Sequence, residues 1–256
     1  MNRIQQFFLR IGMDPDTPIS HDIALLREIQ SRSVCAIAYE NLDILAGKPL
    51  DLSDEGLFHK IVTEHRGGYC FETNGLLSFM LREMGFSVTE RFARWYSQGE
   101  TGVPMRRHRL SIVQLADGAY LCDIGVARIA PRYPLKIEEH TEQVQGMEAY
   151  RMCRDDRHGW VLQERKDGTW QKILCFSDDE AYPIDFVQPS FFCEKHPDSV
   201  FNKDMMVAIK TPEGRCSFDG RVFKQFRGGE LIDMEENISD ERRTQLLREV
   251  FLLNVV

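Results

Sequence analysis

The chain has 256 residues, 43% of them apolar, so it is longer than one typical domain and can bury a sizeable core. Its formal net charge of −8 disfavours a general nucleic-acid-binding protein. The sequence has no apolar run of membrane-spanning length and no signal-peptide pattern, and its seven cysteines contain no CxxC pair. We therefore expect a cytoplasmic protein with reduced cysteines, no metal, and no nucleic-acid or membrane partner.

Apolar residues recur with helical spacing up to about residue 86, which predicts that the first part of the chain is mainly helical. The expected helices cover 4–11, 23–29, the region of 57–61, and 76–84, where Gly85 should end the last of them.

Short apolar runs separated by turns follow from about residue 86 to residue 192, and they predict strands. These strands are expected at 88–96, 109–113, 119–124, 159–164 and 169–176. Asp167-Gly168 is a hairpin signal, whereas the polar stretch 138–148 is expected to be a surface excursion.

The last part of the chain, from about residue 193, is expected to begin with strands and to end with a helix. The strands are expected at 205–210, 215–218 and 221–225, and the helix at 240–253. Ser239 is the expected N-cap of this helix. Its buried face should consist of Leu246, Leu247, Val250 and Phe251.

Cys70 stands in the most informative segment of the sequence, Arg66-Gly67-Gly68-Tyr69-Cys70-Phe71-Glu72. Two glycines precede the cysteine and a helical run follows it, so we expect the thiol at a turn that leads into a helix. Free backbone N–H groups and the positive end of the helix dipole favour a thiolate there. The glycines should let the backbone approach a bound group. We predict that Cys70 is a nucleophile and that the other six cysteines are inert core residues.

A nucleophilic cysteine needs a base, and the base needs a group that orients it. Among the seven histidines, His108 is the best candidate, because it opens a strand-like run after a basic stretch that contains proline and glycine. Asp123 lies on the strand that should return after Asp117-Gly118. Apolar residues flank it, and a carboxylate in such a place is costly unless it is paired. An imidazole N–H is a natural partner.

The loop between the two strands decides whether these side chains meet. A two-residue turn at Asp117-Gly118 would set Asp123 opposite Ile112, too far from His108. A four-residue loop at 114–117 would set Asp123 directly opposite His108. Both lengths are common in hairpins, so the residues alone leave the register open. With the longer loop the two side chains complete a Cys–His–Asp triad.

With these residues identified, the chain closely resembles the arylamine N-acetyltransferases, nearly from end to end. The nucleophile segment matches the family's motif, and His108 and Asp123 fall where the family has its base and its orienting acid, which favours the longer loop. Three further segments are similar to the family's opening helix, its "IPFENLD" segment and a turn of its third domain: Phe8-Leu9-Arg10-Ile11-Gly12, Ile37-Ala38-Tyr39-Glu40-Asn41-Leu42-Asp43 and Thr211-Pro212-Glu213-Gly214-Arg215.

The resemblance implies an α+β fold with a cysteine-protease-like catalytic core. It implies a helical bundle over 1–86 with the nucleophile, a β-barrel over 87–192 with the base and the acid, and an α/β lid over 193–256. It also implies an enzyme of xenobiotic metabolism that moves an acetyl group from acetyl-CoA, its co-substrate, through a thioester on Cys70. The acceptor would be the nitrogen of an arylamine, an arylhydrazine or an N-hydroxyarylamine, and no metal takes part.

Substrate and coenzyme residues are also implied by the resemblance. These are Tyr39 and Val126 for the acceptor, and Thr211 and Gly214 for coenzyme A.

The sequence departs from the family pattern at two places near these residues. The family's "DVGFG" loop reads Asp123-Ile124-Gly125-Val126-Ala127 here, so Val126 replaces an aromatic residue and Ala127 a glycine. Ala38 and Tyr39 stand where proline and phenylalanine are usual. These changes bear on acceptor preference and acetyl-CoA affinity, and leave the triad intact.

Two alternatives remain open from the residues: a thiol hydrolase that uses the same triad, and a weakly active or non-catalytic binding homologue. Two basic clusters, one at Arg106, Arg107 and Arg109 and one at Arg221, Lys224 and Arg227, are expected to be solvated surface charges.

Overall fold

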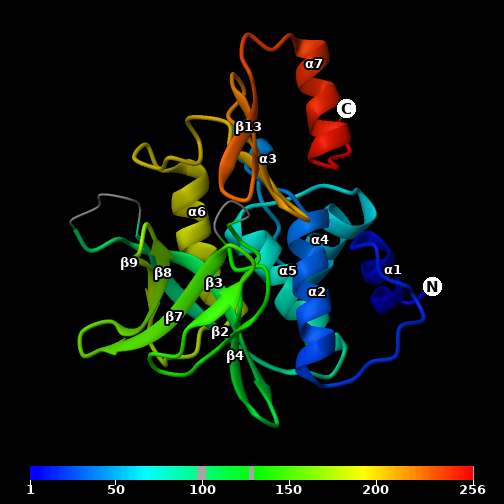
Figure 1. Cartoon of the computed structure of the whole chain (residues 1–256). Coiled ribbons are helices and arrows are strands. Elements are labelled where there is room, and N and C mark those ends of the chain that lie inside the picture. The colour runs from blue at the N-terminus through cyan, green and yellow to red at the C-terminus, as the bar shows by residue number, and fades with distance from the viewer. Residues whose placement is uncertain (97–101, 127–129, 256) are drawn as a thin grey trace.

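Helices dominate the first part of the chain, as expected (Figure 1). The computed structural model describes residues 1–96, 102–126 and 130–255. The helices are α1 (Arg3–Arg10), α2 (Ile23–Ala36), α3 (Leu42–Leu45), α4 (Asp54–Phe58), continued by a π-helical turn over His59–Thr63, and α5 (Cys70–Glu83). Gly85 adopts a φ of +88° just after α5, a conformation that favours glycine, so it is the expected stop.

The α5 helix lies at the centre of the molecule. Every residue of α5 from Cys70 to Leu81 is buried. The helix packs against α4 on one side and against two strands, β2 (Ser87–Trp95) and β3 (Arg106–Leu115), on the other (Figure 1). A single apolar core therefore joins the helices to the sheet. It includes Phe7, Phe8, Leu26, Ile29, Leu76, Met80, Val113 and Ile124.

Eight antiparallel strands form a sheet in the order β5-β4-β3-β2-β9-β8-β7-β6. The strands not yet introduced are β4 (Gly118–Cys122), β5 (Leu135–Lys136), β6 (Gln143–Gln145), β7 (Glu148–Asp155), β8 (Gly159–Lys166) and β9 (Thr169–Phe176). The outermost strands approach each other, because the Gln143 side chain hydrogen-bonds the backbone N–H and C=O of Lys136 at 2.8 and 2.9 Å. The sheet is thus a nearly closed, barrel-like layer.

The prediction that residues 138–148 form a surface excursion is wrong in part. The polar stretch 138–148 contains β6, which pairs with β7 through Val144 and Ala149. Strand β6 has three residues and supplies little apolar area, so its pairing comes from backbone and glutamine hydrogen bonds that a hydrophobic pattern does not reveal.

The last part of the chain begins with a helix that the sequence did not predict, α6 (Val187–Lys195), which follows a 3-10 turn over Pro183–Phe186. A second sheet has the order β1-β10-β11-β12-β13. Its strands are β1 (Tyr39–Glu40), β10 (Val207–Thr211), β11 (Gly214–Phe218), β12 (Phe223–Arg227) and β13 (Glu230–Glu235). Strand β1 comes from the helical part of the chain, so the sheet joins two distant segments. The division of the chain at residues 86 and 192 stays a prediction.

The closing helix is α7 (Asp240–Gln245), continued by a π-helical turn over Leu246–Val250. The Ser239 hydroxyl accepts a hydrogen bond from the Arg242 N–H at 3.2 Å, which confirms the predicted N-cap. Phe251 is fully buried and packs against Phe218 and Phe223 of the second sheet. In the described part of the chain, no helix combines the length and the apolar character needed to cross a membrane.

Candidate active site

Cys70 is the first residue of α5, and Tyr69 is the N-cap. Glu72, in the third helical position, accepts a hydrogen bond from the Tyr69 N–H at 3.2 Å, which fixes the turn before the cysteine. The Glu72 N–H donates to the Tyr69 carbonyl oxygen at 2.9 Å. The N–H groups of Cys70 and Phe71 come too early in the helix to have a carbonyl partner within it. The Cys70 side chain lines a cavity of about 550 Å³, and its Sγ lies 3.7 Å from the carbonyl oxygen of Arg107.

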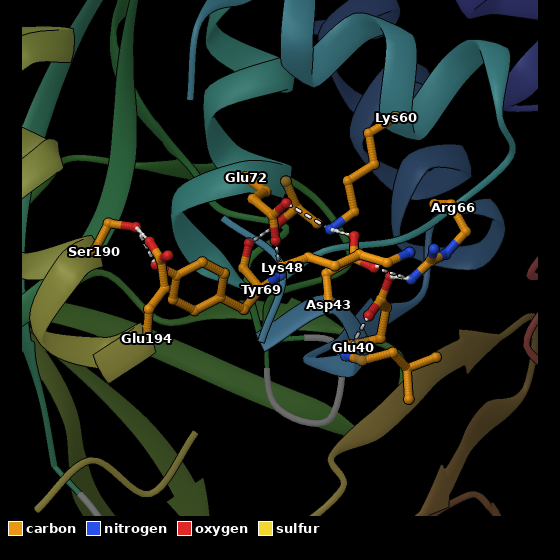
Figure 2. Close-up of polar contacts among 11 residues, drawn as sticks. Glu40, Asp43, Lys48, Lys60, Arg66, Tyr69, Glu72, Ser190 and Glu194 are labelled. Carbon is orange, nitrogen blue, oxygen red and sulfur yellow. Dashed lines mark hydrogen bonds and ion pairs between the residues drawn. The ribbon is translucent and has the colours of Figure 1, made fainter. Parts of the chain in front are cut away.

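A network of buried and half-buried charges adjoins this turn (Figure 2). The Lys60 Nζ lies 2.7 Å from Glu72 and 2.8 Å from Asp43. Arg66 lies 3.1 Å from Asp43 and 3.2 Å from Glu40. Burial raises the pKa of Glu72 to about 7, although Lys60 pulls in the opposite direction. Removing one member would leave a buried charge without its partner, so the network locks the segment that carries the thiol.

The two glycines before Tyr69 leave space for neighbouring atoms of the protein. A Cβ on Gly67 would lie 2.2 Å from the Ala38 carbonyl oxygen, and one on Gly68 would lie 2.7 Å from the Glu72 Cβ. Side chains at these positions would therefore disrupt the buried network. The expectation that these glycines also let the backbone approach a bound group stays a prediction.

His108 and Asp123 are buried and in contact, with 2.6 Å between Nε2 and Oδ2. Because an ionised carboxylate only accepts hydrogen bonds, Nε2 carries a proton, which leaves Nδ1 for the hydrogen bond that His108 shares with Cys70. The other carboxylate oxygen of Asp123 accepts hydrogen bonds from Asn74 Nδ2 and from the Gly125 N–H, both at 2.8 Å.

These contacts set the protonation of the pair. Burial lowers the pKa of His108, but the charge and hydrogen bond of Asp123, with the hydrogen bond to Cys70, outweigh it and raise the pKa to about 10. Burial raises the pKa of Asp123, and His108, Asn74 and Gly125 together bring it below its usual value. These contacts therefore favour the protonated form of His108, which lies between a carboxylate and the cysteine.

Both predicted registers of the β3–β4 hairpin are wrong. The loop has two residues, Ala116-Asp117. Extending this register by one residue places Asp123 opposite Leu110, and not opposite Ile112 or His108. His108 reaches the carboxylate from two residues along the same face of β3, where diagonal neighbours are within reach of long side chains.

Asn74 is the site residue that sequence reasoning missed. Its Oδ1 accepts the Ile124 N–H at 2.8 Å, and its Nδ2 donates to Asp123 and to the Arg109 carbonyl. A Cβ on Gly125 would lie 2.4 Å from Asn74 Nδ2, so this loop packs directly on the helix. One signal was available: a polar amide side chain one helical turn after the cysteine, where it faces the same side of the helix.

The cluster of three arginines near His108 is divided among three environments. Arg106 is exposed, whereas Arg107 is half-buried and lines the cavity. Arg109 is 1% exposed, forms an ion pair with Glu90, and donates to the Phe71 carbonyl at 3.1 Å. The prediction of solvated surface charges is therefore wrong for Arg109, because the buried carboxylate was not visible from the local sequence.

Tyr39 and Val126 line the same cavity as Cys70 and His108. Thr211 pairs with Gly214 at the β10–β11 turn, and neither is among the described residues that line the cavity. The roles assigned to these four residues stay predictions.

The remaining walls of the cavity are largely apolar. They include Trp95, Val200, Phe201, Met205, Ala208, Ser217, Lys224 and Phe226. Ala127, which replaces a family glycine, lies outside the described residues. Within the described ranges, no cluster of three histidine, cysteine or acidic residues is arranged to hold a metal ion.

Comparisons with known proteins agree with this geometry. The family model described as N-acetyltransferase matches residues 22–256. The arylamine N-acetyltransferase of Mycolicibacterium smegmatis is 35% identical over 229 residues, which cover 87% of this chain and 82% of the relative.

Two solved structures are similar over nearly the whole chain. The arylamine N-acetyltransferase from Salmonella typhimurium has a TM-score of 0.94 at 27% identity, covering 100% of this chain and 93% of its own. The Mycobacterium marinum enzyme, solved in complex with CoA, has a TM-score of 0.90 at 31% identity, with 98% and 93% covered. The predicted α+β fold with a cysteine-protease-like core is confirmed. The chain thus belongs to the arylamine N-acetyltransferase family.

Proposed function

We propose that this enzyme transfers an acetyl group from acetyl-CoA, through a thioester on Cys70, to the nitrogen of an arylamine, an arylhydrazine or an N-hydroxyarylamine. One observation carries the proposal. A cysteine at a helix N-terminus shares a hydrogen bond with a buried histidine that is fixed by a carboxylate, and both line one cavity. Family membership supplies the acetyl donor and the acceptor class, which a triad alone does not reveal.

In the first step, the Cys70 thiolate attacks the carbonyl carbon of acetyl-CoA. Free N–H groups at the start of α5, including that of Cys70, stabilise the negative charge that develops on the carbonyl oxygen. The bond between the acetyl carbon and the CoA sulfur then breaks. The His108 proton passes to the departing sulfur, so CoA leaves as a thiol and a neutral imidazole remains. Asp123 keeps the ring oriented throughout.

In the second step, the acceptor nitrogen attacks the acetyl carbon on Cys70. Neutral His108 takes a proton from that nitrogen, and the Cys70 thiolate leaves as the carbon–sulfur bond breaks. The product is an N-acetylated amine, and the free Cys70 sulfur and protonated His108 are restored. The proton that His108 loses to CoA in the first half-reaction is thus replaced in the second by one from the acceptor nitrogen.

The cavity supports this division of roles. Its volume of about 550 Å³ suits an aromatic acceptor or the acetyl end of acetyl-CoA, so the rest of the coenzyme would lie outside. Val126 and Tyr39 are the proposed acceptor contacts. Thr211 and Gly214 lie on a turn beside Arg215, which lines the cavity, and we assign them to the outer part of CoA. All seven cysteines are unpaired, which suits the cytoplasm that we propose as the compartment.

The decisive experiment mixes the enzyme with acetyl-CoA and no acceptor. We expect a burst of one equivalent of CoA, one acetyl group on Cys70 by peptide mass, and release of that group when an arylamine is added. A thiol hydrolase would instead release acetate continuously without the amine, and a non-catalytic homologue would give no burst. Either result contradicts the proposal.

A further inference from the structure

Arg107 occupies an irregularity of the sheet beside the nucleophile. In the β2–β3 ladder, the pairs on either side use Arg106 and His108, so Arg107 is the extra residue of a β-bulge. Consecutive side chains on a regular strand point to opposite faces. Here Arg107 and His108 follow one another and both line the cavity. The bulge thus turns a cationic side chain into the space beside Cys70.

In the described part of the chain, the Arg107 cation has no acidic partner. The Arg107 guanidinium lies over the Phe201 ring, with Cζ 5.8 Å from its centre, and no aspartate or glutamate among the described residues pairs with it. Its neighbour Arg109 is neutralised by Glu90. The Phe201 ring compensates only in part for the hydration that this half-buried charge loses, and an anionic ligand would supply the rest.

The charge of Arg107 acts on groups that face the cavity. Burial and the neighbouring Cys70 raise the pKa of the Tyr39 hydroxyl, and Arg107 acts in the opposite direction. Tyr39 lines the same wall and stands where phenylalanine is usual in the family. The Arg107 guanidinium and the Tyr39 hydroxyl therefore face the same region of the cavity, and both can donate hydrogen bonds to a carboxylate.

The position of Arg107 suits the acceptor better than the donor. Its own carbonyl oxygen is 3.7 Å from Cys70 Sγ, so the side chain starts beside the atom that carries the acetyl group. The phosphates of CoA lie a whole pantetheine arm away from its sulfur.

Another cavity cation, Lys224, is better placed for those phosphates. The ladder runs from Tyr39 through Ala208 and Ser217 to Lys224. These three strand-to-strand steps place Lys224 about 14 Å from Tyr39 along the sheet.

We propose that Arg107 selects acceptors that carry a carboxylate on the aromatic ring, such as aminobenzoates. The guanidinium binds the carboxylate while the ring lies against the apolar walls and the amine attacks the acetyl group on Cys70. This inference rests on the proposed acetyl transfer and adds the chemical class of the acceptor.

The test compares two acceptors of the same shape, 4-aminobenzoate and the neutral 4-aminobenzamide. The measured quantity is the ratio of their kcat/KM values. We expect the wild type to favour the aminobenzoate and Arg107→Met to lower the ratio by about tenfold or more, the loss expected for a charge-assisted pair. Arg107→Lys should retain part of the preference, because it keeps the charge and loses the planar fork.

Arg106→Met is the matched control, since it removes the same charge from the adjacent, exposed residue, which contacts Ser177 outside this cavity. It should leave the ratio unchanged. A wild type without preference, an equal loss on both acceptors in Arg107→Met, or a rise confined to the KM for acetyl-CoA would each overturn the inference. Failure of the proposed function looks different, because neither CoA release without acceptor nor acetylation of either amine would occur.

Discussion

Replacing Asn74 by alanine tests whether the triad is held by the helix that carries the nucleophile. The Asn74 side chain joins α5 to three groups on the sheet side: the Asp123 carboxylate, the Ile124 N–H and the Arg109 carbonyl. All of these groups are buried, so the smaller side chain leaves them without a partner where water does not replace it.

The expected loss of stability follows from these contacts. An unsatisfied buried group costs about 1–3 kcal/mol, and Asp123 keeps its bonds from His108 and Gly125, so we take the low end, about 3 kcal/mol for the three groups. For 256 residues the entropy of unfolding is about 0.5 kcal/mol per kelvin. Asn74→Ala should therefore lower the Tm by about 6 °C. Acetyl loading should slow as well, by less than when Asp123 itself is altered.

Thermal unfolding and the burst of CoA release measure the two effects. Ser78→Ala is the matched control, because Ser78 is buried one turn further along α5 and its hydroxyl has no hydrogen-bond partner among the described residues. That variant should be neutral or slightly stabilising. The reasoning is refuted if Asn74→Ala unfolds within 1 °C of the wild type and loads acetyl at the same rate.

Four further predictions concern the triad and the cavity. Iodoacetamide at neutral pH should label Cys70 ahead of the other six cysteines, although Cys35 and Cys153 are more exposed. Peptide mapping measures the order of labelling, and an order that follows exposure would contradict an activated thiol. Asp123→Asn should keep the fold and lower acetyl loading by orders of magnitude, and a loss of only a few-fold in single-turnover assays would argue against control of the His108 tautomer. Val126→Phe should lower the KM for small arylamines, by a stacking contribution of about 0.5–1.5 kcal/mol, and should exclude bulky arylamines. Slower acetyl loading with unchanged KM values would instead place Val126 in the channel for the acetyl donor. The pKa of His108 rises from about 6.5 in the unfolded chain to about 10 in the folded protein. Its contribution to the free energy of unfolding is therefore complete below pH 6.5 and is lost as the pH rises through 10. Urea titrations should show this loss in the wild type, and an identical pH profile in His108→Gln would count against it.

The features that the sequence predicted well depend on neighbours in the chain. The start of α5 at Cys70 and its stop at Gly85 follow from a glycine pair, an apolar helical run and a second glycine. The Asp167-Gly168 hairpin is confirmed, with Lys166 paired to Thr169 and positive φ angles at both loop residues. In each case the residues that determine the conformation are a few positions apart.

The features that the sequence missed depend on partners far along the chain. The diagonal approach of His108 to Asp123 arises from a hairpin register that neither of the two predicted loops would give. The arginine at 109 is buried because Glu90, on the neighbouring strand, neutralises it. Helix α6 was missed because Pro189 interrupts the pattern, although proline is tolerated in the first turn of a helix. Strand β13 is largely exposed, so no buried face marks it.

Strand β1 has a consequence for the newly synthesised chain. Tyr39 pairs with Ala208, so one wall of the cavity forms only when a segment near the start meets one near the end. Such distant contacts form slowly, because closing a long loop costs entropy before the contact repays it. The helix that carries Cys70 can therefore fold while its sulfur is still uncovered. We expect the thiol to be most vulnerable to cellular oxidants during synthesis, in the interval before β10 reaches β1.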